Sequence, residues 1–122
     1  MKHPRDPIGV REAIWGLIYT IRTQNNFRIH IIIAILAIAL ASFFNVTYTE
    51  WLVIIAMIAM VLVAEMTNTA LEATVDLTVS DLNPIAKIVK DTAAGAVLLA
   101  SLFALSVGII IFLPYFQGLL SS

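Results

Sequence analysis

The sequence predicts an all-α membrane protein, with an amphipathic surface helix at the N-terminal side followed by three transmembrane helices. Of its 122 residues, 61% are hydrophobic and 12% are charged, and that charged share is about half of what a soluble domain carries. The apolar residues gather in three long segments, and the basic residues lie before the first segment or between the second and the third. A chain of this size forms one domain, which we assign to residues 1–122.

The composition also excludes several classes of function. The chain contains no Cys, so it has neither a disulfide framework nor a thiolate metal site. Its net charge is −1, and no basic stripe alternates with aromatic residues, so we expect no nucleic-acid partner.

Residues 8–25 are predicted to form the amphipathic helix, which can begin after Pro7. Apolar residues recur there at three- and four-residue spacing, which gives one apolar stripe. The stripe consists of Val10, Ala13, Ile14, Leu17, Ile18 and Ile21. We expect this helix to lie in the membrane interface, with Trp15 and Tyr19 at the depth of the lipid headgroups.

The first transmembrane helix is predicted over residues 28–45. Its apolar part, 29–44, spans roughly 24 Å as a helix, which is shorter than the hydrocarbon core of about 30 Å. It can cross the membrane if Phe27 and Arg28 snorkel at one end or if the bilayer thins locally. We expect Asn45 to mark the following turn.

The second and third helices have recognisable start signals. Thr47 and Glu50 form a capping-box pattern ahead of the second helix, 50–78, whose last part is polar and extends beyond the membrane. Asn83 followed by Pro84 is a typical N-cap and first-turn pair for the third helix, 84–116. We expect Pro114 to end that helix rather than to kink it.

All seven Lys and Arg residues lie before the first span or between the second and the third. By the positive-inside rule, the N-terminal segment and the connection between the second and third spans are cytoplasmic.

Four polar residues form a stripe where a membrane helix would ordinarily be apolar. Glu65, Asn68, Glu72 and Asp76 fall within an arc of about 80° on one helix face. An ionised carboxylate at a helix centre costs about 2.5–3.5 kcal/mol even on translocon-based scales. Asn68 and Glu72 offer oxygen ligands suited to Mg²⁺, and Glu65 is placed to accept a proton from a lipid hydroxyl. The alternative is a polar clamp between helices.

Two further groups of polar residues border the spans. Lys87 and Lys90 share a helix face and can cradle phosphate oxygens, or they can serve only as topology anchors. The sequence has no glycine-rich phosphate loop. The other group lies between the surface helix and the first span, where it can form a site or simply a hinge. It consists of Gln24, Asn25, Asn26 and His30. If the surface helix continues to Gln24, this side chain faces the bundle.

Residues 65–98, EMTNTALEATVDLTVSDLNPIAKIVKDTAAGAVL, resemble the signature of the prokaryotic diacylglycerol kinase and undecaprenol kinase family. That signature reads Glu-x-x-Asn-[Thr/Ser]-Ala-[Ile/Leu]-Glu-Ala-x-x-Asp and continues with an Ala-Lys-x-x-Lys-Asp stretch. The matching positions are Glu65, Asn68, Thr69, Ala70, Glu72, Ala73, Asp76, Lys90 and Asp91. The resemblance extends over nearly the whole chain.

The resemblance implies a lipid kinase of the bacterial inner membrane that uses ATP and Mg²⁺ and forms a homotrimer with active sites between protomers. It implies that Glu65 is the catalytic base, that Asn68 and Glu72 belong to the metal site, and that Lys90 and Asp91 contact the nucleotide. We group Lys87 and Asn68 with the nucleotide contacts as well. One position departs from the family: Gln24 stands where the family usually has a metal-binding Glu, which lowers the expected affinity for Mg²⁺.

The loop 83–87 is more similar to the undecaprenol kinase branch than to the diacylglycerol kinase branch, so undecaprenol is slightly favoured as the lipid alcohol. Two other functions stay open. One is a small oligomeric cation channel or carrier, although residues 51–64 provide no polar path through the rest of the membrane. The other is a structural membrane protein, such as a kinase that Gln24 has inactivated.

Overall fold

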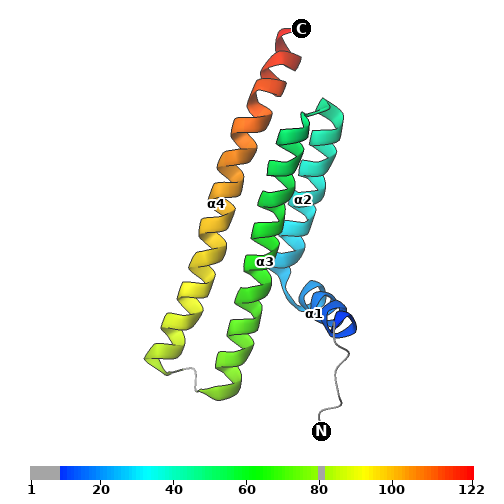
Figure 1. Cartoon of the computed structure of the whole chain (residues 1–122). Coiled ribbons are helices and arrows are strands. Elements are labelled where there is room, and N and C mark those ends of the chain that lie inside the picture. The colour runs from blue at the N-terminus through cyan, green and yellow to red at the C-terminus, as the bar shows by residue number, and fades with distance from the viewer. Residues whose placement is uncertain (1–8, 80–81) are drawn as a thin grey trace.

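The computed structural model describes residues 9–79 and 82–122, and in these ranges the chain is almost entirely helical. Four helices follow one another along the chain (Figure 1): α1 (Val10–Thr23), α2 (Asn25–Phe44), α3 (Tyr48–Thr78) and α4 (Pro84–Ser121). The helices α2, α3 and α4 are long and apolar enough to cross a membrane. The predicted fold class is therefore confirmed.

The short helix α1 lies at an angle beside the end of α2 from which α2 begins (Figure 1). It ends at Thr23 because Gln24 has an extended backbone, with φ −108° and ψ 108°. The guanidinium of Arg28 donates to the carbonyl oxygens of Ile21 at 3.2 Å and Arg22 at 3.1 Å. These carbonyls lie in the last turn, where a helix leaves its acceptors unpaired. Arg28 thus ties α1 to α2. The start predicted at residue 8, after Pro7, lies outside the described residues.

Helix α2 begins at Asn25, earlier than predicted, and its 20 residues give a length of about 30 Å. The whole helix is about as long as the hydrocarbon core is thick, while its apolar part is still 29–44, because its first turn contains Asn25, Asn26 and Arg28. The helix ends at Phe44, and its C-cap residue Asn45 has a left-handed backbone with φ 50°. The Val46 N–H then donates to the Ala41 carbonyl at 3.2 Å.

The predicted start signals of α3 and α4 are both present. The Glu50 N–H donates to Thr47 Oγ1 at 3.2 Å, and the Thr47 N–H donates to Glu50 Oε1 at 3.0 Å, which completes the capping box. At the start of α4, Asn83 Oδ1 accepts from the N–H groups of Ile85 at 2.9 Å and Ala86 at 3.1 Å. These caps fix where the two longest helices begin.

The expectation that Pro114 ends the last helix is wrong. Helix α4 continues through Pro114 to Ser121, beyond the predicted end at residue 116. A proline removes one backbone donor and crowds one carbonyl, whereas an unwound segment in an apolar environment would leave several backbone groups unpaired. The helix therefore tolerates the single proline.

The three long helices pack through small residues and one apolar cluster. Helix α4 turns Ala86, Ala93 and Ala100 inward at seven-residue intervals, and small residues at such positions let helix backbones approach closely. At the end of the bundle away from α1, a cluster of buried side chains joins α2, α3 and α4. It consists of Ala41, Val46, Ile54 and Ile111.

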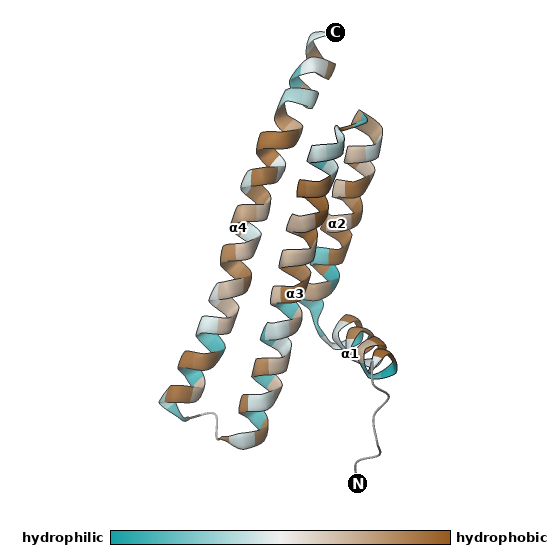
Figure 2. Ribbon diagram, viewed as in Figure 1, coloured by the Kyte–Doolittle hydropathy of each residue, from teal (hydrophilic) through white to brown (hydrophobic). Residues whose placement is uncertain are grey.

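Aromatic side chains reinforce this cluster. The rings of Phe44 and Tyr115 stack with their centroids 5.4 Å apart, and the Tyr115 hydroxyl donates to the Glu50 carboxylate. Figure 2 shows hydrophobic residues over most of the length of the three long helices, with hydrophilic residues frequent toward the α1 end of α3. The polar part of α3 is therefore at the end of the bundle near α1.

Phe27 is the largest fully buried side chain among the described residues, with 2% of its surface exposed. We predict that Phe27→Ala lowers the free energy of unfolding by about 3 kcal/mol, because truncation of a buried Phe leaves a cavity that its neighbours fill only in part. Unfolding by SDS in mixed micelles measures this change. Phe103→Ala is the matched control, since Phe103 is 58% exposed. Equal losses in the two variants would contradict the assignment of Phe27 to the core.

Candidate functional site

The polar stripe of α3 contains one deeply buried carboxylate and a hydrogen-bonded pair. Glu65 is 4% exposed, whereas Asn68 and Glu72 are half-buried and Asp76 is exposed. The Asn68 amide donates from Nδ2 to Glu72 Oε1 at 3.0 Å. This is the i, i+4 neighbour relation that the sequence spacing provides on a helix face.

Glu65 has a partner on another helix. The imidazole of His30, on α2, places Nε2 3.2 Å from Glu65 Oε1, and the two side chains are 20% and 5% exposed. The sequence places His30 in the polar group beside the first span but does not connect it with Glu65. A signal was available, because His30 is the sole ionisable residue in segment 29–47, and ionisable residues within a span usually have a functional partner.

Two basic residues of α4 have different surroundings. Lys90 Nζ lies 2.5 Å from Asp76 Oδ1, so this ion pair connects the first turns of α4 with the polar stripe of α3. Lys87 Nζ instead lies 2.5 Å from Asp91 Oδ2 on the same helix, and both of these side chains are more than half exposed. The structure thus brings Lys90 to the stripe and pairs Lys87 with Asp91 on the surface of α4.

Asn68 and Glu72 are suited to a hard cation. Asn68 Oδ1 is buried and accepts no hydrogen bond from any described residue, and the Glu72 carboxylate is bonded to the amide of the same Asn68 side chain. The described part of the chain contains no group of three His, Cys, Asp or Glu residues placed for a metal. One carboxylate and one amide oxygen nevertheless fit Mg²⁺, which usually retains water and phosphate oxygens in its coordination shell.

Gln24 lies at the junction of α1 and α2, where it is half-buried. Its amide donates from Nε2 to Thr23 Oγ1 at 3.4 Å. Within residues 9–79 and 82–122 of one chain, Gln24 makes no hydrogen bond to Asn68 or Glu72.

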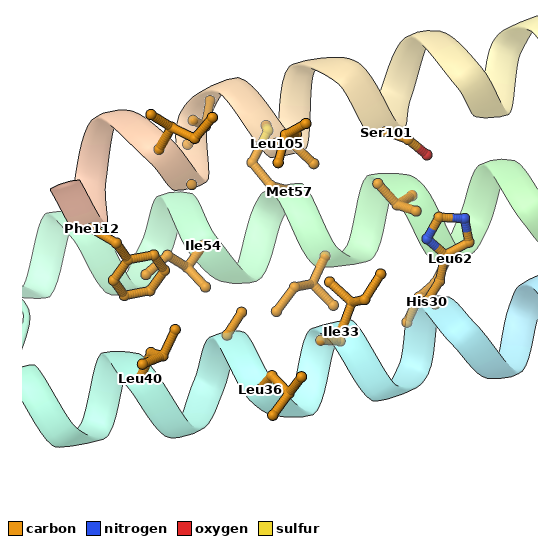
Figure 3. Close-up of a pocket in the computed structure, with 18 of the residues that line it drawn as sticks. His30, Ile33, Leu36, Leu40, Ile54, Met57, Leu62, Ser101, Leu105 and Phe112 are labelled. Carbon is orange, nitrogen blue, oxygen red and sulfur yellow. The ribbon is translucent and has the colours of Figure 1, made fainter. Parts of the chain in front are cut away.

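An apolar groove with a cavity volume of about 640 Å³ leads to this site (Figure 3). Helices α2, α3 and α4 all contribute to its walls, and His30 and Ser101 provide the polar side chains at one end. Phe112 lies toward the other end (Figure 3), and Phe116 also lines the groove. From Ser101 to Phe116 the groove follows α4 for about 22 Å. Because His30 contacts Glu65, the polar end of the groove is next to the buried carboxylate.

Several known proteins have similar sequences. The family model described as prokaryotic diacylglycerol kinase matches residues 11–112. A diacylglycerol kinase of Synechocystis sp. is 42% identical over 108 residues, which cover 88% of the present chain and 62% of that protein. An undecaprenol kinase of Bacillus subtilis is 36% identical over 99 residues, which cover 81% of the chain and 80% of that protein.

A diacylglycerol kinase of Helicobacter pylori is 34% identical over 80 residues, which cover 66% of the chain and 62% of that protein. The chain thus spans less than two thirds of the length of the two diacylglycerol kinases. The family match covers the described parts of α2 and α3 completely and most of α4. The chain belongs to the prokaryotic diacylglycerol kinase family.

Proposed function

We propose that this protein is a lipid kinase that transfers the γ-phosphate of ATP to the hydroxyl group of a membrane lipid alcohol. The position of Glu65 is the main support for this function. This carboxylate is buried among apolar helices, beside the polar end of a groove and one to two helical turns from Asn68 and Glu72.

The groove suits the hydrocarbon chain of the acceptor. Its lining is apolar except for His30 and Ser101, so an apolar chain in the groove would have its hydroxyl at the polar end, next to Glu65. The hydroxyl oxygen bonds to the γ-phosphorus, and the bond from this phosphorus to the β–γ bridging oxygen breaks. ADP leaves with that electron pair, and the hydroxyl proton passes to Glu65, which acts as general base.

The remaining polar residues would hold the nucleotide. We assign Asn68 and Glu72 to Mg²⁺, with Gln24 as a further candidate ligand, and Lys90, Asp91 and Lys87 to the nucleotide. Bound Mg²⁺ supplies charge neutralisation at the phosphates. Asp76 holds the Lys90 ammonium at the end of the stripe, where a cation can stabilise charge that develops during transfer.

We further propose that residues 1–122 act as one lipid kinase domain within a homotrimer whose sites lie between protomers. Among the described residues of one chain, Gln24 forms no hydrogen bond to Asn68 or Glu72. A homotrimer would let Gln24 of one copy complete the site of a neighbouring copy. The distribution of basic residues favours a multi-pass arrangement in the bacterial inner membrane with the site on the cytoplasmic side, where ATP is available.

Undecaprenol is our preferred substrate over diacylglycerol, because the Bacillus subtilis undecaprenol kinase is matched over 80% of its length. The test offers each lipid separately in detergent micelles with radiolabelled MgATP and follows phosphate in the lipid fraction. We expect faster transfer to undecaprenol. Faster transfer to diacylglycerol would contradict the substrate preference, and transfer to neither lipid would contradict the proposed function.

Gln24 provides a prediction about the metal. We predict that Gln24→Glu increases the apparent affinity of the kinase reaction for Mg²⁺ by about tenfold, because a carboxylate adds a negative charge that a hard cation prefers over an amide. A Mg²⁺ titration of the transfer rate measures this change. Asn26→Asp adds the same charge on the neighbouring turn and is the control. An equal effect of both variants would point to general surface charge instead of a ligand at residue 24.

A further inference from the structure

The contact between His30 and Glu65 joins two transmembrane helices at a point where both side chains are largely shielded. Nε2 of His30 lies 3.2 Å from Oε1 of Glu65, which is a direct contact between an imidazole nitrogen and a carboxylate oxygen. Helix α2 is otherwise apolar from residue 29 to its end except for Ser42. A polar residue at this one position therefore calls for an explanation beyond packing.

The two oxygens of the Glu65 carboxylate have different surroundings. The His30 imidazole approaches Oε1, with Nε2 at 3.2 Å, so it lies on the Oε1 side of the carboxylate. A carboxylate without a partner can rotate about its terminal torsion, which has a broad energy profile. A polar contact to one oxygen restricts this rotation and thereby the direction in which the other oxygen points.

We propose that His30 is a positioning residue, whose imidazole contacts Oε1 of Glu65 and thereby directs Oε2 to the acceptor hydroxyl at the end of the groove. This inference rests on the proposed lipid kinase function. The same imidazole borders the groove (Figure 3). His30 can therefore orient the carboxylate and also mark the end of the groove at which the lipid hydroxyl lies.

The effect of such positioning falls on the chemical step. A general base works only within hydrogen-bond reach of the proton that it removes, and a misplacement of about 1 Å can reduce the rate by roughly 10²-fold. Because His30 is not needed to hold ATP in this scheme, its loss should lower kcat and leave KM for ATP nearly unchanged.

The first test compares two substitutions in the full-length protein in lipid bicelles. We expect His30→Leu to lower kcat by about 10- to 100-fold, with KM for ATP within about twofold of the original. His30→Gln keeps an N–H donor near the position of Nε2 and should restore kcat to within about fivefold of the original. Ser106→Leu removes a polar side chain from an exposed part of α4 outside the groove and serves as the control.

Equal loss of kcat in His30→Leu and His30→Gln would overturn the proposal, and so would full activity in His30→Leu. If the unchanged protein itself phosphorylates neither lipid, the proposed function fails instead, and the positioning contact is then judged by a second measurement that needs no activity.

The second measurement is nitrogen-15 NMR of the histidine side chains. We expect the proton of His30 to be on Nε2, since the hydrogen bond of one ring nitrogen determines the tautomer, and we expect this signal to shift in Glu65→Leu. A proton on Nδ1 alone, or a His30 signal that is the same in Glu65→Leu, would overturn the contact on which the proposal rests.

Discussion

Replacement of Glu65 by Gln is expected to lower kcat for lipid phosphorylation by about 10²- to 10⁴-fold, the usual contribution of a general base. The amide has nearly the same shape as the carboxylate, and its oxygen can still accept from His30, so the packing of α2 against α3 should persist. It cannot take up the hydroxyl proton. We therefore expect the loss to appear in kcat, with little change in the binding of ATP.

Initial rates of lipid phosphorylation over a range of ATP concentrations measure this effect. Thr67→Val is the control, because Thr67 is an exposed neighbour on α3 whose hydroxyl donates to the Val63 carbonyl of its own helix. A Glu65→Gln variant that keeps more than a tenth of the original kcat would remove Glu65 from the role of general base.

The second large effect is expected at Glu72. We predict that Glu72→Gln lowers the apparent affinity for Mg²⁺ by at least tenfold, because it removes the carboxylate from the pair that Asn68 and Glu72 form. Raised Mg²⁺ should recover part of the activity, since the substitution weakens binding of the ion without removing the base at Glu65.

A Mg²⁺ titration of the transfer rate tests this prediction, and electron paramagnetic resonance of bound Mn²⁺ tests it without catalysis. Glu50→Gln is a matched control, because Gln can also complete the capping box with Thr47 at the beginning of α3, far along that helix from Glu72. If Glu72→Gln has the Mg²⁺ dependence of the original protein, Glu72 does not bind the ion.

The parts of the fold that were predicted correctly depend on local signals. The capping box of Thr47 and Glu50 and the Asn83 cap before Pro84 act within four residues, so the sequence contains all the information that fixes these helix starts. The pairing of Asn68 with Glu72 is similarly local, because residues four apart on a helix are neighbours.

The features that were missed depend on packing or on the surrounding medium. Pro114 was expected to end α4, but a helix in an apolar environment is favoured over an unwound segment even at the cost of one backbone hydrogen bond. The contact of His30 with Glu65 joins α2 to α3, and the ion pair of Lys90 with Asp76 joins α4 to α3. Neither can be obtained from residue spacing, because each depends on how two helices pack.

The position of Gln24 differs from the one that the predicted extent of the surface helix implied. The helix was expected to extend to residue 25, which would turn Gln24 toward the bundle, but α1 ends at Thr23 and Gln24 has an extended backbone. The residue belongs to the hinge between α1 and α2. Its role as a metal ligand is therefore a proposal that the Gln24→Glu titration tests.

If one site couples ATP cleavage to phosphorylation of a lipid hydroxyl, both products form together, and a single reaction in which both are measured tests this coupling. ADP and phosphorylated lipid would be quantified together over time, with and without added lipid alcohol. We expect equal amounts of ADP and phosphorylated lipid, and no ADP without the lipid. ADP formed without phosphorylated lipid, or neither product with correctly assembled protein at high Mg²⁺, would contradict this coupling.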